Sequence, residues 1–205
     1  GEIIGADIML EWVYATNRLT VEDIFSSSHG SKACSIGNLM QEGNMMGYLT
    51  STTEQDPEIL KQSIIRLTLH EVGHTLGLNH NFKASFLHNS KDVHNKELTQ
   101  KIGLTGSVME YPAVNLAPKG VKQGDYYDTR TGPYDLWAIE FGYKPLLTPE
   151  EREVLLQKSN LPEHMFANDS EDMRSPGKGI DPRAMINDLS NEPIIYAEQR
   201  IQLVN

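Results

Sequence analysis

The sequence predicts an α+β fold, and two observations support that prediction. Four or five segments carry the capping residues and hydrophobic spacing of helices, whereas only two or three resemble strands. The 205 residues, 39% of them hydrophobic and 22% charged, have the length and composition of one large soluble domain or two small ones. We therefore expect a small mixed sheet that packs against helices, followed by a mainly helical C-terminal part.

The two candidate strands lie ahead of the first helix. Residues 4–14 are strand-like, and residues 44–50 form a second, shorter candidate. Between them, residues 26–37 are rich in Ser and Gly and predict a loop. The chain begins without an initiator Met or a signal peptide, and its last predicted helix runs into the final residues. We expect the sequence to be an excerpt of a longer protein.

The first predicted helix begins after Asp56 and ends at Gly77. Asp56 is a typical N-cap, and Pro57 suits the first helical position, where its missing N–H would have no partner. Gly77 tolerates the left-handed backbone that often ends a helix. Apolar residues recur every three or four positions along the segment and predict a stripe that faces a core. This stripe consists of Ile65, Leu69, Val72 and Leu76.

Further helices are predicted along the rest of the chain. Two of them are followed by a glycine, one opens with a capping box at Thr148, and the last opens with a proline. Residues 168–188 contain many Pro, Gly and Asp residues and predict a long irregular connection. The helices are expected at residues 92–102, 133–141, 149–158 and 193–203.

Composition excludes several classes of protein. A net charge of -10 opposes binding to nucleic acid, because that affinity depends on clustered cations that neutralise phosphates. No apolar run approaches the ~20 residues that a transmembrane helix needs. A single cysteine, Cys34, rules out an internal disulfide.

Residues 70–80 (HEVGHTLGLNH) form a metal-binding pattern. On a helix, His70 and His74 lie one turn apart, about 40° around the axis and about 6 Å along it, so both imidazoles can reach one ion. Gly77 lets the chain turn out of the helix, so that His80 can return as a third ligand. Three protein ligands leave one position of a tetrahedral zinc for water, which is the arrangement of a hydrolase. The pattern predicts a catalytic Zn²⁺ site.

Glu71 is the predicted general base. It projects about 100° away from His70 around the helix, beside the metal rather than on it. Zinc lowers the pKa of a bound water to about 7, and Glu71 can take its proton and later pass it to the departing amine. A lone His pair on a helix is often a structural accident, but five fixed identities in one short pattern are rare by chance.

Residues 107–111 (SVMEY) supply a second pattern, and with the three histidines they resemble the metzincin clan of zinc endopeptidases. The resemblance implies that Met109 lies in a tight Met-turn as a hydrophobic floor beneath the zinc and is not a ligand. It also implies that Tyr111 approaches the zinc and stabilises the oxyanion. A half-buried core tyrosine whose hydroxyl bonds elsewhere is the structural alternative for Tyr111.

Several further segments are similar to the bacterial met-zincin domain family, and together they cover nearly the whole chain. This resemblance implies large, exported, multidomain zinc metallopeptidases of bacteria, in which accessory domains of the same chain flank the catalytic domain. The similar segments are residues 79–85, 106–109, 132–143 and 181–183.

The resemblance also implies a division of the chain. Residues 1–80 would be a partial N-terminal subdomain with the sheet and the zinc helix, and residues 81–205 a C-terminal subdomain with the Met-turn and helices. Metzincins place a strand, a long helix and further strands ahead of the zinc helix. Only about 55 residues precede it here, so we expect the N-terminal part to be truncated.

Three further features are weaker candidates for functional or structural sites. Residues 43–49 could be the edge strand that pairs with an extended peptide substrate, or an ordinary loop. Asp135 could brace the Met-turn by hydrogen bonds or satisfy the start of its own helix. The acidic residues lack the spacing of a calcium-binding loop, so we interpret them as solvated. They are Asp125, Asp128, Asp169, Glu171 and Asp172.

The sequence therefore predicts a zinc metalloendopeptidase that acts on a protein or peptide. One rival is a zinc hydrolase of another amide substrate, because the chemistry would differ only in what the cleft admits. The other is an inactive zinc-stabilised binding module. Glu71 argues against the second rival, since a structural site needs no base and usually has four protein ligands.

Overall fold

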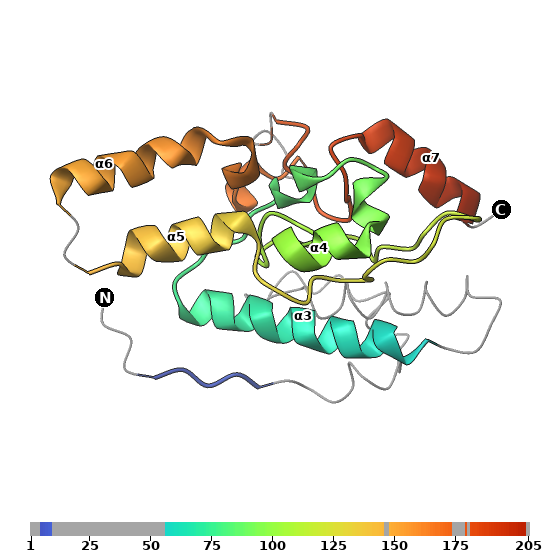
Figure 1. Cartoon of the computed structure of the whole chain (residues 1–205), viewed down its shortest axis with the longest axis horizontal. Helices are drawn as coiled ribbons and strands as arrows, with labels where there is room; N and C mark the ends of the chain where they lie inside the picture. Colours follow the sequence, from blue (N-terminus) through green and yellow to red (C-terminus); the bar gives the residue numbers. More distant parts are fainter. Residues whose placement is uncertain (1–4, 10–55, 146–147, 174–178, 180, 204–205) are drawn as a thin grey trace.

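A computed structural model describes residues 5–9, 56–145, 148–173, 179 and 181–203. Among these residues the longest helix is α3 (Pro57–Thr75), and four shorter helices lie above it in the view of Figure 1. The shorter helices are α4 (Lys96–Ile102), α5 (Pro133–Tyr143), α6 (Pro149–Gln157) and α7 (Pro193–Leu203). Single 3-10 turns connect them: η2 (Ala84–Leu87), η3 (Asp92–His94), η4 (Lys158–Asn160), η5 (Pro162–His164) and η6 (Asp169–Glu171).

The predicted α+β class is wrong for the residues that the structure describes, which form helices and irregular segments and contain no strand or sheet. Residues 5–9, part of the first candidate strand, are exposed and irregular. Residues 43–49 and 44–50 lie outside the described residues. In the long segment after α4, side chains such as Asp128 and Gln123, rather than a neighbouring strand, satisfy many of the backbone groups. Hydrogen bonds from side chains therefore replace the ladder of a sheet.

Helix α3 begins as predicted but buries a different face. The Asp56 carboxylate accepts a hydrogen bond from the Glu58 amide at 2.9 Å, and Pro57 is the first helical residue. The predicted apolar stripe is not the buried face, because Val72 and Leu76 are each 38% exposed. The buried face is mostly polar, and it consists of Ile59, Gln62, Ser63, Arg66, Leu67, His70 and Gly73.

The other helices follow the predictions with local differences. The segment predicted as one helix over residues 92–102 is divided into η3 and α4, because the Asn95 side chain caps α4 by accepting from the Leu98 amide. Helix α5 continues through Gly142 to Tyr143. The predicted capping box of α6 is confirmed: Thr148 and Glu151 exchange hydrogen bonds between side chain and backbone. No helix among the described residues is long and apolar enough to cross a membrane.

Two groups of buried side chains make up the described core. The larger group joins α3 to the chain beyond His80, because it combines Leu67 with Phe82, Tyr111 and Tyr127. The smaller group packs α7 against the segments around Val93 and Leu104. The predicted division of the chain after residue 80 stays a prediction, and the larger group draws residues from both sides of that position.

Candidate metal centre

Three histidines from α3 and the turn after it converge on one point. His70 and His74 lie one turn apart on α3, and His80 lies in the segment that follows the helix. One ring nitrogen of each lies within 4.8 Å of those of the other two, and the Nε2 atoms of His74 and His80 are 3.2 Å apart. The structure thus brings together the three residues that the spacing predicts as ligands.

Each imidazole is oriented by a hydrogen bond at its other nitrogen. His70 Nδ1 lies 2.8 Å from the Val108 carbonyl oxygen, and His74 Nδ1 lies 3.0 Å from the Leu78 carbonyl oxygen. His80 Nδ1 lies 2.8 Å from a carboxylate oxygen of Asp169. Because all three partners can only accept, each Nδ1 carries the proton, and each Nε2 keeps a lone pair for a metal. The donor set therefore fits Zn²⁺, which binds neutral imidazole.

His70 is held in the neutral form by its surroundings. Burial, followed by the positive charge of Arg66, lowers the pKa of His70 to about 2. A protonated imidazole cannot bind a metal, so this shift favours the form that a ligand requires.

The turn after α3 gives His80 its position. Gly77 adopts a φ of +84°, the left-handed backbone that the sequence predicts there. The Leu78 amide then donates to the Gly73 carbonyl at 3.0 Å, while the Leu78 carbonyl accepts from His74. The turn therefore both reverses the chain and orients the second ligand.

Met109 lies against α3 at Gly73, between His70 and His74 in the sequence, and its role as the floor of a Met-turn stays a prediction. Its side chain is fully buried, and its sulfur would be 2.3 Å from a Cβ atom built on Gly73. Only a glycine at residue 73 leaves space for the sulfur at this distance. The pair Gly73 and Met109 therefore sets how closely the Met-turn approaches the zinc helix.

Buried charged groups hold the backbone of the Met-turn. Arg66 donates to the carbonyl oxygens of Val108 and Glu110, and its Nε is 3.6 Å from Asp128. Val108 O thus accepts from both Arg66 and His70, which joins the turn to the first ligand. Glu110 accepts from the amides of Ser85 and Tyr111.

Asp135 fulfils both roles that the sequence leaves open. Its carboxylate accepts from the Ser107 hydroxyl and the Val108 amide of the Met-turn, and also from the Gly132 amide that precedes α5. Burial raises the pKa of Asp135, and these three hydrogen bonds lower it. One buried carboxylate therefore links the Met-turn to the start of α5.

Tyr111 places its hydroxyl at the ligand atoms. The side chain is buried, and its oxygen is 3.0 Å from Nε2 of His80. Since His80 carries its proton on Nδ1, the hydroxyl donates this hydrogen bond. Glu71 lies next to His70 on α3 and is partly exposed, and helical geometry directs it about 60° away from His74.

The interpretation of the acidic residues as solvated is wrong for several of them. Asp125, Asp128 and Asp172 are buried, and Asp169 bonds to His80. Asp125 accepts from Gln62 and Thr99. Asp128 accepts from the Leu104 and Thr105 amides and the Thr105 hydroxyl. Donors from the protein therefore already surround Asp125 and Asp128, as expected of structural carboxylates.

Sequence reasoning missed two residues of the centre. Asp169 lies 89 positions from His80, and no local spacing connects them. Arg66 lies four residues before His70, on the same face of α3. This spacing could have predicted that Arg66 belongs to the site. A cation on the helical face that carries the ligands is expected to bind acceptors beneath the site.

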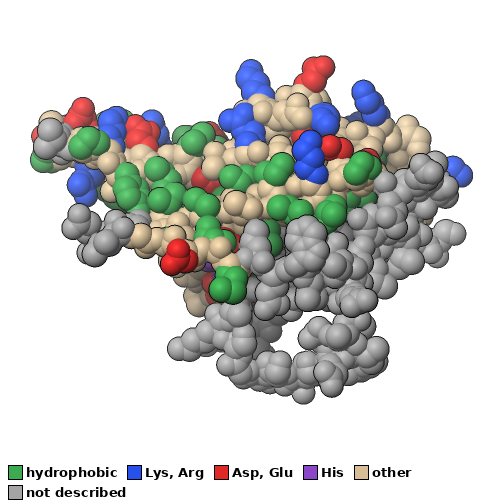
Figure 2. All heavy atoms as spheres, turned by 90° about the horizontal axis from the view of Figure 1, so that it is seen from below, with side chains coloured by type: hydrophobic (Ala, Val, Ile, Leu, Met, Phe, Trp, Pro, Cys, Tyr) green, Lys and Arg blue, Asp and Glu red, His purple; other side chains and the backbone are tan. Residues whose placement is uncertain are grey.

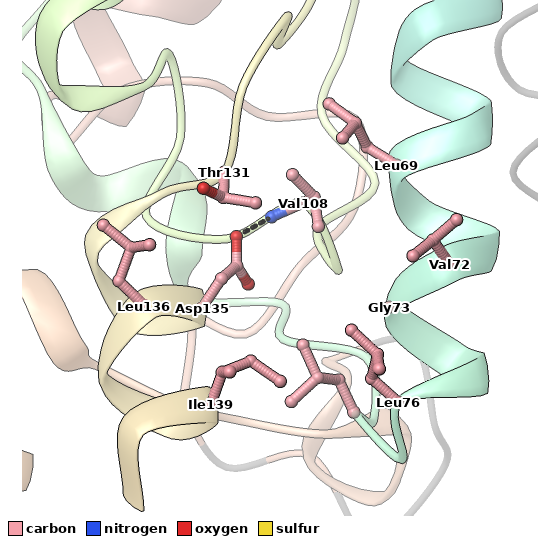
Figure 3. Close-up of a pocket in the computed structure, with 10 residues that line it drawn as sticks. Leu69, Val72, Gly73, Leu76, Val108, Thr131, Asp135, Leu136 and Ile139 are labelled. Carbon is pink, nitrogen blue, oxygen red and sulfur yellow. Dashed lines mark hydrogen bonds between the residues drawn. The ribbon is translucent and has the colours of Figure 1, made fainter. Parts of the chain in front are cut away.

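An apolar groove of about 270 Å³ lies between α3 and α5, lined by Leu69, Val72, Leu76, Leu136 and Ile139 among others (Figure 3). Val72 and Leu76 each project about 160° from His74 around α3, so the groove lies behind the helix relative to the metal ligands. Figure 2, which views the molecule from the side of α3, shows several hydrophobic side chains on this face. The predicted stripe therefore lines a groove rather than a closed core.

Comparison with known proteins agrees with this geometry. The family described as Met-zincin matches residues 52–205, which include all three histidines, the Met-turn and Asp169. No curated protein and no solved structure matches the chain. The family match and the three converging histidines together indicate a protein similar to zinc metallopeptidases. Because the match covers most of its length, the chain belongs to the Met-zincin family.

Proposed function

We propose that the protein is a zinc-dependent metalloendopeptidase that cleaves peptide bonds. The observation that supports this most strongly is the convergence of three Nε2 lone pairs, each fixed by a hydrogen bond at Nδ1. The carboxylate of Glu71 lies on the same helix, next to the first ligand. Three neutral ligands and a nearby carboxylate are the groups that hydrolysis at zinc requires.

Each residue of the site has a role in this proposal. Zinc, when bound to the three histidines, lowers the pKa of a water molecule to about 7 and polarises the substrate carbonyl. Glu71 accepts the proton of the attacking water and transfers it to the amine that leaves. Met109 supports the ligands from below, and the Tyr111 hydroxyl donates to the oxygen on which negative charge develops.

The position of Tyr111 supports its role without a large movement. Its hydroxyl already lies 3.0 Å from a ligand nitrogen, and its ring packs 4.7 Å from the ring of His80 and 5.3 Å from that of His70, measured between centroids. Because the side chain is buried, its orientation is restricted before substrate binds. Such preorganised donors contribute a few kcal/mol to catalysis.

The Glu71→Ala variant tests the proposal. We expect it to bind one zinc ion with unchanged affinity but to cleave a peptide library at least about 10²-fold more slowly, because the general base is lost. Glu97→Ala, at an exposed position of α4, is the matched control and should cleave at the wild-type rate. Cleavage by Glu71→Ala at the wild-type rate would overturn the mechanism.

The peptide library also separates the proposed substrate class from its rivals. Mass spectrometry of the products identifies internal peptide bonds as the target if new termini appear within the peptides. Release of ammonia from side-chain amides, with intact peptide chains, would instead indicate a hydrolase of another amide. A protein that binds zinc and yields neither product would be a binding module.

A further inference from the structure

The third ligand is supported differently from the other two. His70 and His74 are held by a rigid helix, and each donates its Nδ1 proton to a backbone carbonyl. His80 lies beyond the helix, and its Nδ1 lies 2.8 Å from a side chain, the carboxylate of Asp169. The orientation of this imidazole therefore depends on a residue from a distant part of the chain.

The segment that carries Asp169 is bound firmly to the segment that carries His80. The Phe82 amide donates to the Ala167 carbonyl at 2.7 Å. The Asn81 side chain donates to the Met165 carbonyl at 2.9 Å and accepts from the Ala167 amide at 3.2 Å. Asn81 and Ala167 are fully buried. These three hydrogen bonds hold the two segments side by side, within four residues of the His80–Asp169 contact.

The start of η6 fixes the local backbone around Asp169. The Asn168 side chain accepts from the Ser170 amide at 3.0 Å, and the Glu171 carboxylate accepts from the Asn168 amide at 3.0 Å. Asp169 itself is not needed for this capping box, and its side chain is 66% exposed, whereas that of His80 is only 15% exposed. A change at Asp169 therefore removes a contact of His80 without disturbing the core.

We propose that Asp169 is a positioning residue of the metal centre. Its carboxylate accepts the Nδ1 proton of His80, holds the ring so that Nε2 faces the other two ligands, and strengthens Nε2 as an electron donor through its negative charge. Residues 165–169 thereby belong to the metal centre although they supply no ligand. This inference rests on the proposed zinc site and is independent of whether the protein cleaves peptides.

The test is a measurement of zinc affinity by competition with a chelator of known affinity. We expect Asp169→Ala to bind zinc about 10- to 100-fold more weakly than the wild type, the usual cost of losing such a partner. Asp169→Asn keeps an oxygen that can accept but loses the charge, so its affinity should lie between the two. Glu163→Gln, a change of charge at an exposed position of η5, should bind within about twofold of the wild type.

A spectroscopic measurement on the metal-free protein separates positioning from a general structural role. In the wild type, the nitrogen shifts of the His80 ring should report the tautomer with the proton on Nδ1. In Asp169→Ala they should report a mixture of both tautomers, while His70 and His74 remain unchanged because backbone carbonyls hold them. An unchanged His80 tautomer would contradict the proposal.

The outcomes distinguish this proposal from the proposed function. Equal zinc affinity of Asp169→Ala and the wild type would overturn the role of Asp169 and leave the peptidase proposal intact. Weaker zinc binding by Asp169→Ala, in a protein that cleaves no peptide, would support the positioning role and overturn the peptidase. A wild-type chain that binds no zinc would overturn both.

Discussion

The two faces of α3 differ in a way that reverses the usual expectation. The face toward the Met-turn is buried and polar, with Arg66 and His70 fully enclosed and bonded to backbone carbonyls. The opposite face is apolar, and its residues Val72 and Leu76 remain partly exposed along the groove with α5. Hydrophobicity alone would have assigned the two faces the other way round.

The difference shows what the candidate metal centre requires of its helix. Ligand imidazoles need acceptors for Nδ1, and the turn beneath them needs partners for its amides and carbonyls. Only polar residues provide such groups. On the buried face of α3, directed hydrogen bonds therefore take the place of apolar contacts. The apolar face has no such demand and packs more loosely.

Of the substitutions that test the difference between the two faces, loss of Arg66 should lower the stability of the protein most. Arg66→Met removes the cation that Asp128 faces and leaves two carbonyl oxygens of the Met-turn without this donor. We expect the free energy of unfolding to fall by about 3–5 kcal/mol, as for other broken buried ion pairs. Denaturant titration of the metal-free protein measures it.

The matched control for Arg66→Met is Lys61→Met on the same helix. Lys61 is exposed and forms an ion pair with Glu58 at the surface, so its loss should change the unfolding free energy by less than about 1 kcal/mol. If the two variants lost similar amounts of unfolding free energy, the buried polar face of α3 would contribute no more to stability than its exposed surface.

The pH dependence of stability tests two buried acids, Glu110 of the Met-turn and Asp188, whose carboxylates both accept hydrogen bonds from Ser85. Burial raises the pKa of Asp188 to about 7, and burial together with Asp188 raises the pKa of Glu110. The folded protein therefore retains protons on these two carboxyl groups that the unfolded chain releases above about pH 4. Their contribution to stability should fall as the pH rises from about 4 to about 7, whereas neutral His70 contributes in the opposite direction. Each unit of pKa difference corresponds to about 1.4 kcal/mol.

Unfolding of the metal-free protein at several pH values provides the measurement. Because Asp188→Asn removes one of the two groups and leaves His70 in place, the stability of the variant relative to the wild type should rise across this interval. A wild-type stability that increases from pH 4 to pH 7 by more than that of the variant would show that Asp188 is ionised in the folded state.

Two glycines allow a smaller and more selective comparison. Gly73→Ala places a Cβ atom against the buried sulfur of Met109, so we expect a loss of about 1–3 kcal/mol in unfolding free energy. At Gly142 of α5 a Cβ atom meets nothing within 4 Å, so Gly142→Ala should raise stability by about 0.5–1 kcal/mol through helix propensity. Thermal unfolding of both variants should thus shift in opposite directions, and a shift in the same direction would contradict the close packing at residue 73.

The helices could largely be predicted, because their signals are local. Asp56 and Pro57 start α3, Thr148 starts α6, and both assignments are confirmed. The predicted sheet is wrong for the described residues. A short apolar segment does not specify which other segment, if any, it pairs with as a strand. The interruption at Asn95 was also missed, since a capping side chain within a helical pattern looks like an ordinary polar residue.

The same distinction holds for the candidate site. The convergence of His70, His74 and His80 could be predicted, because helical geometry and one glycine determine it. The partners of these ligands could not, because Asp169 comes from a distant segment. The burial of Arg66 was hidden by its charge, which normally indicates a surface position.

The contact between His80 and Asp169 also has a consequence for the order of assembly. It closes a loop of 89 residues, whereas His70 and His74 come together as soon as α3 forms. Long loops cost more entropy to close and form later than local contacts. During synthesis, we expect the first two ligands to be arranged before residue 169 has left the ribosome, and the third to be oriented only afterwards. Tight metal binding would then mark a chain that is already folded through residue 169.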